Sequence, residues 1–248
     1  MTAIQIFTTP ADMGLHVGMF GEIGGENASP AIQGMVDAVG YFTLPAGTFL
    51  CKDPIEVQPP SLSVDTVFAG RGVGKSILQA TNMAGAALFK PCAATGLYRF
   101  SMRDLSLIGD ADSAFDFTLD DGGGNQLYKS QFQNVHFRSI VGPAFKSRNE
   151  FATTHINCSF HSDQGHALHM GGGNSTLLLS CYAHKCGSGM AGYRIEKQAT
   201  LVACLGLDDA TNPCYWGWFG KEWGGIYRIA IIGGNAEDFR TAAIALEY

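Results

Sequence analysis

Four short segments in the second half of the chain align without gaps at a spacing of 23 residues. They are NVHF from Asn134, NCSF from Asn157, SCYA from Ser180 and ACLG from Ala203. DLSL from Asp104 and AIIG from Ala230 extend the series with longer spacings. A period of this length is typical of solenoid folds, because one repeat cannot bury its apolar side chains alone and stacks on the next. The repeat therefore limits the possible folds more than any other feature of the chain.

Each repeat contains two further candidate strands. The second strand reads SAFDF from Ser113, PAFKS from Pro143, HALHM from His166, AGYRI from Ala191, PCYWG from Pro213 and TAAIAL from Thr241. The third reads STLLL from Ser175, ATLVA from Ala199 and GIYRI from Gly225. Three short strands per turn predict a parallel β-helix, with regular coils over about 98–248. The 32 glycines and the charged fraction of 15% also favour a turn-rich, all-β protein.

A short helix is predicted near residues 30–39, before the first coil. Ser29 and Pro30 form a typical N-cap and first-turn pair. Ile32, Met35 and Val36 then follow at helical spacing, as does Val39. We expect this helix to cover the unpaired end of the first coil, which would otherwise invite edge-to-edge association.

The first third of the chain resembles a known family. Phe20–Val39 (FGEIGGENASPAIQGMVDAV), Gly40–Leu50 (GYFTLPAGTFL) and Gly70–Leu78 (GRGVGKSIL) are similar to the N-terminal part of pectate-lyase-like right-handed parallel β-helix proteins, above all phage tailspikes and capsule depolymerases. That family shows a capping helix, an LPAGTY strand and a G-x-G-x-T-x-L turn and strand. One departure is Asn27-Ala28-Ser29, where the family has two acidic residues and a threonine.

The resemblance implies several further properties. The fold is expected to be an all-β, right-handed parallel β-helix over residues 20–248, with an N-terminal arm over 1–19 that attaches to the virion. The expected assembly is a homotrimer in the virion tail, formed in the host cytoplasm. The expected partners are other tail proteins and a bacterial surface polysaccharide.

The stretch AGRGVGKSI (69–77) superficially matches a phosphate-binding loop. That motif needs a helix after the loop, whereas Ser76–Thr81 alternates apolar and polar residues as a strand does. We therefore interpret this stretch as a turn between β-helix strands, with glycines that tolerate left-handed backbone angles.

Composition argues against several other classes of protein. The net charge is −6 and Lys and Arg are not clustered, so nucleic acid is not an expected partner. No apolar run is long enough to span a membrane, and the N-terminus lacks the pattern of a signal peptide. The seven cysteines lack metal-site spacing, so we expect neither a metal nor a cofactor. Cys158, Cys181 and Cys204 are expected to form a buried column of thiols.

The 23-residue register brings chemically active side chains together on the outer face. With Val135 and Phe137 inward, the outward columns are His136, Ser159, Tyr182 and Leu205, followed by Arg138, His161, His184 and Leu207. The flanking turn places Asp163 and Asp209 two coils apart, at roughly 9–10 Å. This separation suits the acid and base of an inverting glycosidase. Alternatively, Arg138, His161 and His184 could supply the base and cation of a polysaccharide lyase.

Other residues are candidates for binding sugars. Tyr182 and Asp208 lie beside the proposed catalytic group, and Lys146, His169, Arg194 and Trp216, with Trp218 nearby, form a second outward column. Aromatic rings stack on sugars and cations pair with acidic sugars. Two less specific interpretations remain open: ordinary solvated residues for the first group, and a subunit interface for the second. A run of aspartates near Asp110 is more typical of a solvated loop than of a calcium site.

Together these features predict a phage tailspike or tail-fibre protein. We expect it to bind and depolymerise a bacterial surface polysaccharide, as a glycoside hydrolase or a lyase. Asp163 and Asp209 are the candidate acid and base. The alternative is a non-catalytic receptor-binding or structural virion fibre.

Overall fold

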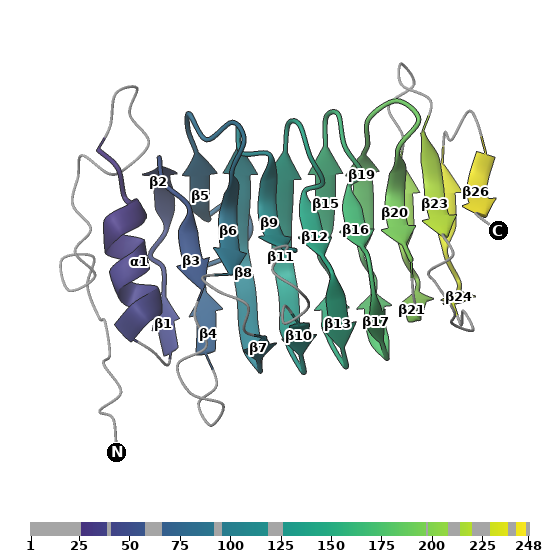
Figure 1. Ribbon diagram of the computed structural model, residues 1–248, viewed down its shortest axis with the longest axis horizontal. Helices are drawn as coiled ribbons and strands as arrows, with labels where there is room; N and C mark the ends of the chain where they lie inside the picture. Colours follow the sequence, from purple (N-terminus) through teal and green to yellow (C-terminus); the bar gives the residue numbers. More distant parts are fainter. Residues whose placement is uncertain are drawn as a thin grey trace.

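The protein is an all-β parallel solenoid with one short helix at its N-terminal end (Figure 1). The computed structural model describes residues 26–38, 41–57, 66–91, 96–118, 126–196, 198–207, 214–219, 229–237 and 242–246. Its coils stack side by side from α1 to β26, so the chain forms a rod whose long axis runs through successive turns. The proposed arm over 1–19 lies outside the described residues.

Three parallel sheets run along the rod. Sheet A contains β1 (Tyr41–Thr43), β2 (Gly47–Cys51), β4 (Thr66–Ala69), β5 (Ser76–Ala80), β8 (Phe100–Gly109), β11 (Gln131–Ser139), β14 (Thr154–Ile156), β15 (Ser159–Ser162), β18 (Thr176–Leu179), β19 (Tyr182–Lys185), β21 (Ala199–Val202), β22 (Leu205–Leu207), β24 (Ile229–Ile232) and β25 (Asn235–Glu237). Sheet B contains β3 (Ile55–Val57), β6 (Ala87–Pro91), β9 (Ser113–Phe117), β12 (Phe145–Ser147), β16 (Leu168–Met170), β20 (Ala191–Ile195), β23 (Tyr215–Phe219) and β26 (Ala242–Leu246). Sheet C contains β7 (Leu97–Tyr98), β10 (Gln126–Tyr128), β13 (Asn149–Phe151) and β17 (Gly173–Asn174).

The predicted 23-residue register is confirmed for sheet A. Phe137 pairs with Phe160, Phe160 with Ala183, and Ala183 with Gly206. All four lie in the buried interior. The segment AIIG is an exception, since Ala230 pairs with Thr200 of β21 and not with the strand that follows it. AIIG therefore belongs to the strand before the bend of sheet A, and the prediction that it continues the first-strand series was wrong.

A bend divides sheet A in every coil from β8 onward. The residues at the bend have positive φ angles of 51–58°; they are Asp104, Asn134, Asn157, Ser180 and Ala203. Asparagine and aspartate tolerate this conformation better than other residues that carry a side chain. Asn157 Nδ2 donates to Asn134 Oδ1 at 2.8 Å, and Asn134 Nδ2 donates to Asp104 Oδ1 at 2.9 Å. The first residue of each repeat segment therefore lies at the bend of its coil.

The interior is filled by columns of aromatic rings and thiols. Phe115 stacks on Phe145 with ring centroids 5.0 Å apart, and Phe137 stacks on Phe160 at 5.5 Å. The predicted buried thiol column is confirmed, because Cys158, Cys181 and Cys204 are at most 1% exposed. Burial raises the pKa of the Cys181 thiol well above its ordinary value, so this group is a core residue and not a nucleophile.

One polar cluster is completely enclosed by this core. Glu150 and His155 are both 0% exposed, and their Oε2 and Nε2 atoms lie 3.0 Å apart. Ser147 donates to Glu150 Oε1 at 2.7 Å. The His155 ring stacks on Phe132 at 5.0 Å, and its Nδ1 has no hydrogen-bond partner. A buried polar cluster of this kind stabilises the protein only while both partners remain.

The helix α1 (Ser29–Ala38) lies across the first coil. Its side chains Ile32, Met35 and Val36 are buried in the core, as expected. The capping prediction needs one correction. The Ser29 hydroxyl donates to the carbonyl of Asp53, whereas Asn27 Oδ1 accepts the Ser29 N–H and thereby caps the helix. No helix in the described part of the chain is long and apolar enough to cross a membrane.

The turn between β4 and β5 has the form expected from its glycines. Gly72 and Gly74 have positive φ angles of 135° and 73°, and Ser76 begins β5 and not a helix. The prediction of a turn in place of a phosphate-binding loop is confirmed, because no helix N-terminus follows the loop.

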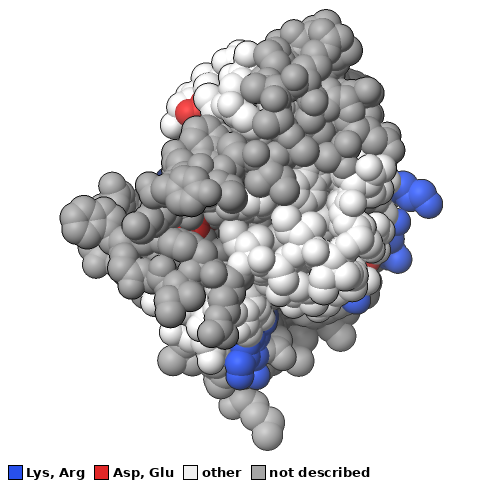
Figure 2. Space-filling view, turned by 90° about the vertical axis from the view of Figure 1, so that its right-hand side faces the viewer, with Lys and Arg blue, Asp and Glu red and all other residues white. Residues whose placement is uncertain are grey.

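Figure 2 shows the opposite end of the rod. The described atoms there are mostly uncharged, with Lys and Arg side chains along the rim. Ile231 and Ile232 of β24 are 39% and 57% exposed.

A disulfide between Cys186 and Cys214, which the sequence analysis did not anticipate, joins the turn after β19 to the segment before β23.

Candidate functional site

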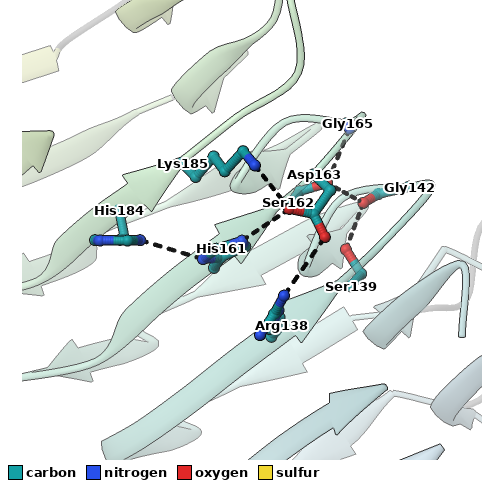
Figure 3. Close-up of polar contacts among 9 residues, drawn as sticks. All are labelled: Arg138, Ser139, Gly142, His161, Ser162, Asp163, Gly165, His184 and Lys185. Carbon is teal, nitrogen blue, oxygen red and sulfur yellow. Dashed lines mark hydrogen bonds and ion pairs between the residues drawn. The ribbon is translucent and has the colours of Figure 1, made fainter. Parts of the chain in front are cut away.

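The site lies on the outward face of sheet A, where β11, β15 and β19 run side by side (Figure 3). Arg138 pairs with His161, as expected. The next pairing shifts by one residue, so His161 faces Lys185 and His184 becomes the extra residue of a β-bulge. The prediction that His184 continues the ladder was therefore wrong by one position. Lys185 was missed because a gapless repeat has no place for the bulge.

Asp163 is at the centre of the group. Its Oδ1 lies 3.1 Å from Lys185 Nζ and 3.1 Å from His161 Nε2, and its Oδ2 lies 3.7 Å from Arg138 Nη2. Burial raises the pKa of this carboxyl, but hydrogen bonds from His161 and Lys185 outweigh burial and leave it below the ordinary value. Asp163 is therefore a carboxylate at neutral pH.

The turn that carries Asp163 is held in place by the coil before it. Ser162 Oγ donates to the Gly142 carbonyl at 2.7 Å and accepts the Gly165 N–H at 2.8 Å. A Cβ at Gly165 would lie 2.5 Å from the carbonyl carbon of Gly142, so a larger residue cannot fit there. This close stacking fixes Asp163 at the end of β15.

The two histidines form a chain that leads from Asp163 to solvent. Burial lowers the pKa of His161, and its hydrogen bond to Asp163 offsets only part of this effect. A neutral His161 that donates from Nε2 leaves Nδ1 as an acceptor. His184 Nδ1 lies 3.2 Å from that atom and can only donate to it. The neutral form of the exposed His184 then presents an unprotonated Nε2 at the surface.

Two further side chains complete this face. The Tyr182 ring lies 5.7 Å from His184 in an edge-on arrangement. Burial, followed by the nearby His161, Arg138 and His184, lowers the pKa of His136 to about 4. His136 is consequently neutral at pH 7, and the charges of this face come from Arg138, Lys185 and Asp163.

The second predicted column lies on sheet B and is only partly as expected. Lys146 pairs with His169, His169 with Arg194, and Arg194 with Trp218 of β23. The assignment of Trp216 to this column was wrong. Trp216 is 3% exposed and packs on Tyr193, and Trp218, two residues later, is the residue that pairs with Arg194. A buried indole cannot stack on a sugar.

The charges of this second column compensate one another. Lys146 pairs with Asp116 at 3.3 Å, and His169 Nε2 and Arg194 Nε lie 2.9 and 2.8 Å from Glu196 Oε1. Hydrogen bonding from His169 lowers the pKa of Glu196. Sequence reasoning missed Glu196, which stands one residue beyond β20. The column is therefore a less suitable anion site than the face around Arg138.

Asp208 and Asp209 lie outside the described residues. The structure brings Arg138, His161, Asp163 and His184 together, with Lys185 added and Tyr182 alongside. Among the residues that the structure describes, no group of three or more His, Cys, Asp or Glu side chains is arranged to hold a metal ion.

His166 beneath the second column should make stability depend on pH. Its Nδ1 accepts the Ala191 N–H at 2.9 Å, and Arg194 Nη1 lies 3.2 Å from its Nε2. Burial, followed by the nearby His169 and Arg194, lowers the pKa of His166 to about 3. The unfolded chain binds the proton first, so stability is lost as the pH falls from about 6.5 towards 3.

From pH 7 to pH 5 this group alone should remove about 2 kcal/mol of unfolding free energy. Urea titrations at both pH values would measure the loss for the wild type and for His166→Gln, which has no titrating ring. We expect the variant to lose about 2 kcal/mol less over this interval. Equal losses in the two proteins would contradict this assignment.

Comparison with known proteins adds a similarity of fold. No protein-family model and no curated protein matches the chain. Among solved structures, the tailspike protein of Acinetobacter baumannii phage AM24 is 11% identical with a TM-score of 0.48, over 88% of this chain and 44% of that one. The A-module of the mannuronan C-5 epimerase AlgE6 from Azotobacter vinelandii is 12% identical with a TM-score of 0.45, over 92% and 78%. ORF18 of Geobacillus virus E2 is 12% identical with a TM-score of 0.32, over 85% and 57%.

Proposed function

We propose that the face around Arg138 binds an acidic bacterial surface polysaccharide and cleaves it by β-elimination. The observation that carries this proposal is the chain Asp163–His161–His184, which ends in an exposed imidazole, while Arg138 and Lys185 contact Asp163 at the other end of the chain. A lyase needs a base for the C5 proton of a uronate and a cation for its carboxylate. These side chains provide both within one group.

The same geometry does not favour the glycosidase assignment. A general acid in a glycosidase needs a raised pKa, so that it holds a proton at neutral pH. The pKa of Asp163 is lowered, and its carboxylate contacts Arg138, His161 and Lys185. The lowered pKa argues against Asp163 as the acid of the predicted Asp163/Asp209 pair, and we assign Asp163 as the residue that orients His161 and retains the proton on its Nε2.

The proposed reaction needs no cofactor. His184 Nε2 removes the C5 proton of the bound uronate while Arg138 stabilises the negative charge that develops on its carboxylate. The electron pair of the C5–H bond becomes the C4=C5 double bond, and the C4–O bond breaks. The leaving oxygen takes a proton from water, and the His184 proton returns to solvent.

We also propose that the chain is a virion tail component that assembles as a homotrimer. The support is the motif resemblance of residues 20–80 to phage tailspikes. Light scattering that gave a monomer mass would overturn the trimer.

A time course on acidic polysaccharides tests the reaction. New reducing ends and ultraviolet absorbance should rise together, because each elimination creates one unsaturated uronate and one reducing end. Reducing ends without absorbance would show hydrolysis and would overturn the elimination. Binding without either signal would favour the alternative, a receptor-binding fibre without catalysis.

A further inference from the structure

A hollow of about 350 Å³ lies next to the candidate site on the side of the N-terminal coils. Its side-chain lining comes from Gln79, Thr81, Ile108, Asp110, Arg138 and Ile140. Gln79 pairs with Ile108 in the neighbouring coil, and Arg138 stands one coil further on, where it also pairs with His161. The hollow and the candidate site therefore share Arg138 and form one continuous surface along the rod.

The charge of this surface changes at Arg138. On one side, the cations of Arg138 and Lys185 suit the carboxylate of a uronate. On the other side, the hollow is lined by the carboxylate of Asp110 as well as by Arg138, whose charge the first uronate would already neutralise. Asp110 Oδ2 and Oδ1 accept the N–H groups of Asn82 and Met83 at 2.6 and 3.1 Å, so the loop holds this carboxylate in place. A second uronate in the hollow would face this anion and be repelled.

The other groups of the hollow suit an uncharged sugar. Ile140 is 37% exposed and provides an apolar surface for the C–H face of a sugar ring. Gln79 and Thr81 offer an amide and a hydroxyl at the edge of the hollow. Each Asp110 oxygen retains a lone pair that can accept a sugar hydroxyl.

We propose that the hollow holds an uncharged sugar next to the uronate, so that the ligand is a heteropolymer of alternating acidic and neutral sugars. This inference rests on the proposed function of the same site and narrows its substrate class. It predicts that homopolymeric uronans bind poorly, because the uronate seated in the hollow would place its carboxylate against Asp110.

The test compares two kinds of oligosaccharide of equal length. Alternating probes are hyaluronan and unsulfated chondroitin, which combine glucuronate with an N-acetylhexosamine; homopolymeric probes are polygalacturonate and polymannuronate. Calorimetric titration in a His184→Gln background prevents cleavage during the measurement. We expect an alternating probe to bind at least about tenfold more tightly than either homopolymer, a difference of ~1.4 kcal/mol.

Two substitutions at Gln79 give a matched comparison. Gln79→Lys places a cation opposite Asp110 and should strengthen binding of homopolymeric uronans about fivefold or more, whereas Gln79→Met is a neutral control without this gain. Homopolymers that bind as tightly as the alternating probes, with no response to Gln79→Lys, would overturn this inference and leave the elimination site standing. If no probe binds, both proposals fail.

Discussion

Replacement of His184 by glutamine is expected to lower the rate of elimination by about 10²–10⁴-fold, the usual contribution of a general base. The amide retains a donor for His161 Nδ1, so the site should retain its shape. Substrate binding depends on Arg138 and Lys185, which do not change. We therefore expect the loss to appear in kcat, with KM within about twofold of the wild-type value.

Initial rates of ultraviolet absorbance at several substrate concentrations would measure this effect. His169→Gln is a control with the same change of side chain, since His169 lies on sheet B, where it contacts Glu196 and not the group around Asp163. It should retain wild-type kcat. A His184→Gln protein with wild-type kcat would exclude His184 as the base, whereas an equal loss in both variants would point to a general effect on folding.

Replacement of Glu150 by leucine is expected to cost about 3–5 kcal/mol of unfolding free energy, because it leaves His155 buried without its partner. Glu150 Oε2 lies 3.0 Å from His155 Nε2, and both residues are 0% exposed. Ser147 would also lose the acceptor for its hydroxyl. This should be one of the most destabilising single substitutions in the core.

Replacement of both partners should reverse most of that loss. In Glu150→Leu/His155→Phe the new ring can occupy the place between Phe132 and Phe145, and the unpaired Nδ1 of His155 disappears. We expect the free energy of unfolding of the double variant to lie within about 1 kcal/mol of the wild-type value. Urea unfolding of the wild type, both single variants and the double variant completes the cycle. Additive losses would contradict coupling between Glu150 and His155.

Much of the fold could be predicted because the repeat is carried by residues with strong local preferences. Asn134 and Asn157 tolerate the left-handed backbone at the corner of each coil. Phe137 and Phe160 must lie on the buried face because strand residues alternate sides. The same alternation places Arg138 beside His161 on the opposite face. It also places both residues near Asp163, which follows His161 by two residues.

The errors arose where an inserted residue changed the register. One extra residue in β19 moved Lys185 into the place assigned to His184, and in β23 Trp218 occupies the place beside Arg194 that was assigned to Trp216. A register shift of one residue moves every following side chain of the strand to the other face. The local sequence pattern does not reveal such a shift. The Glu150–His155 pair was missed because it depends on the bend between β13 and β14, and the Cys186–Cys214 bridge was missed because it depends on how neighbouring coils stack.

The period and the residue types of this chain thus determine a stacked parallel β-helix, its capping helix and the inward columns, because these depend on local backbone preference and on alternation. The tertiary structure decides which charged side chains meet. A bulge at His184 brings Lys185 to Asp163 and directs His184 to solvent, and the stacking of consecutive coils places Asp110 and Arg138 around one hollow. Those contacts lie between coils, where small differences in turn length decide the partner.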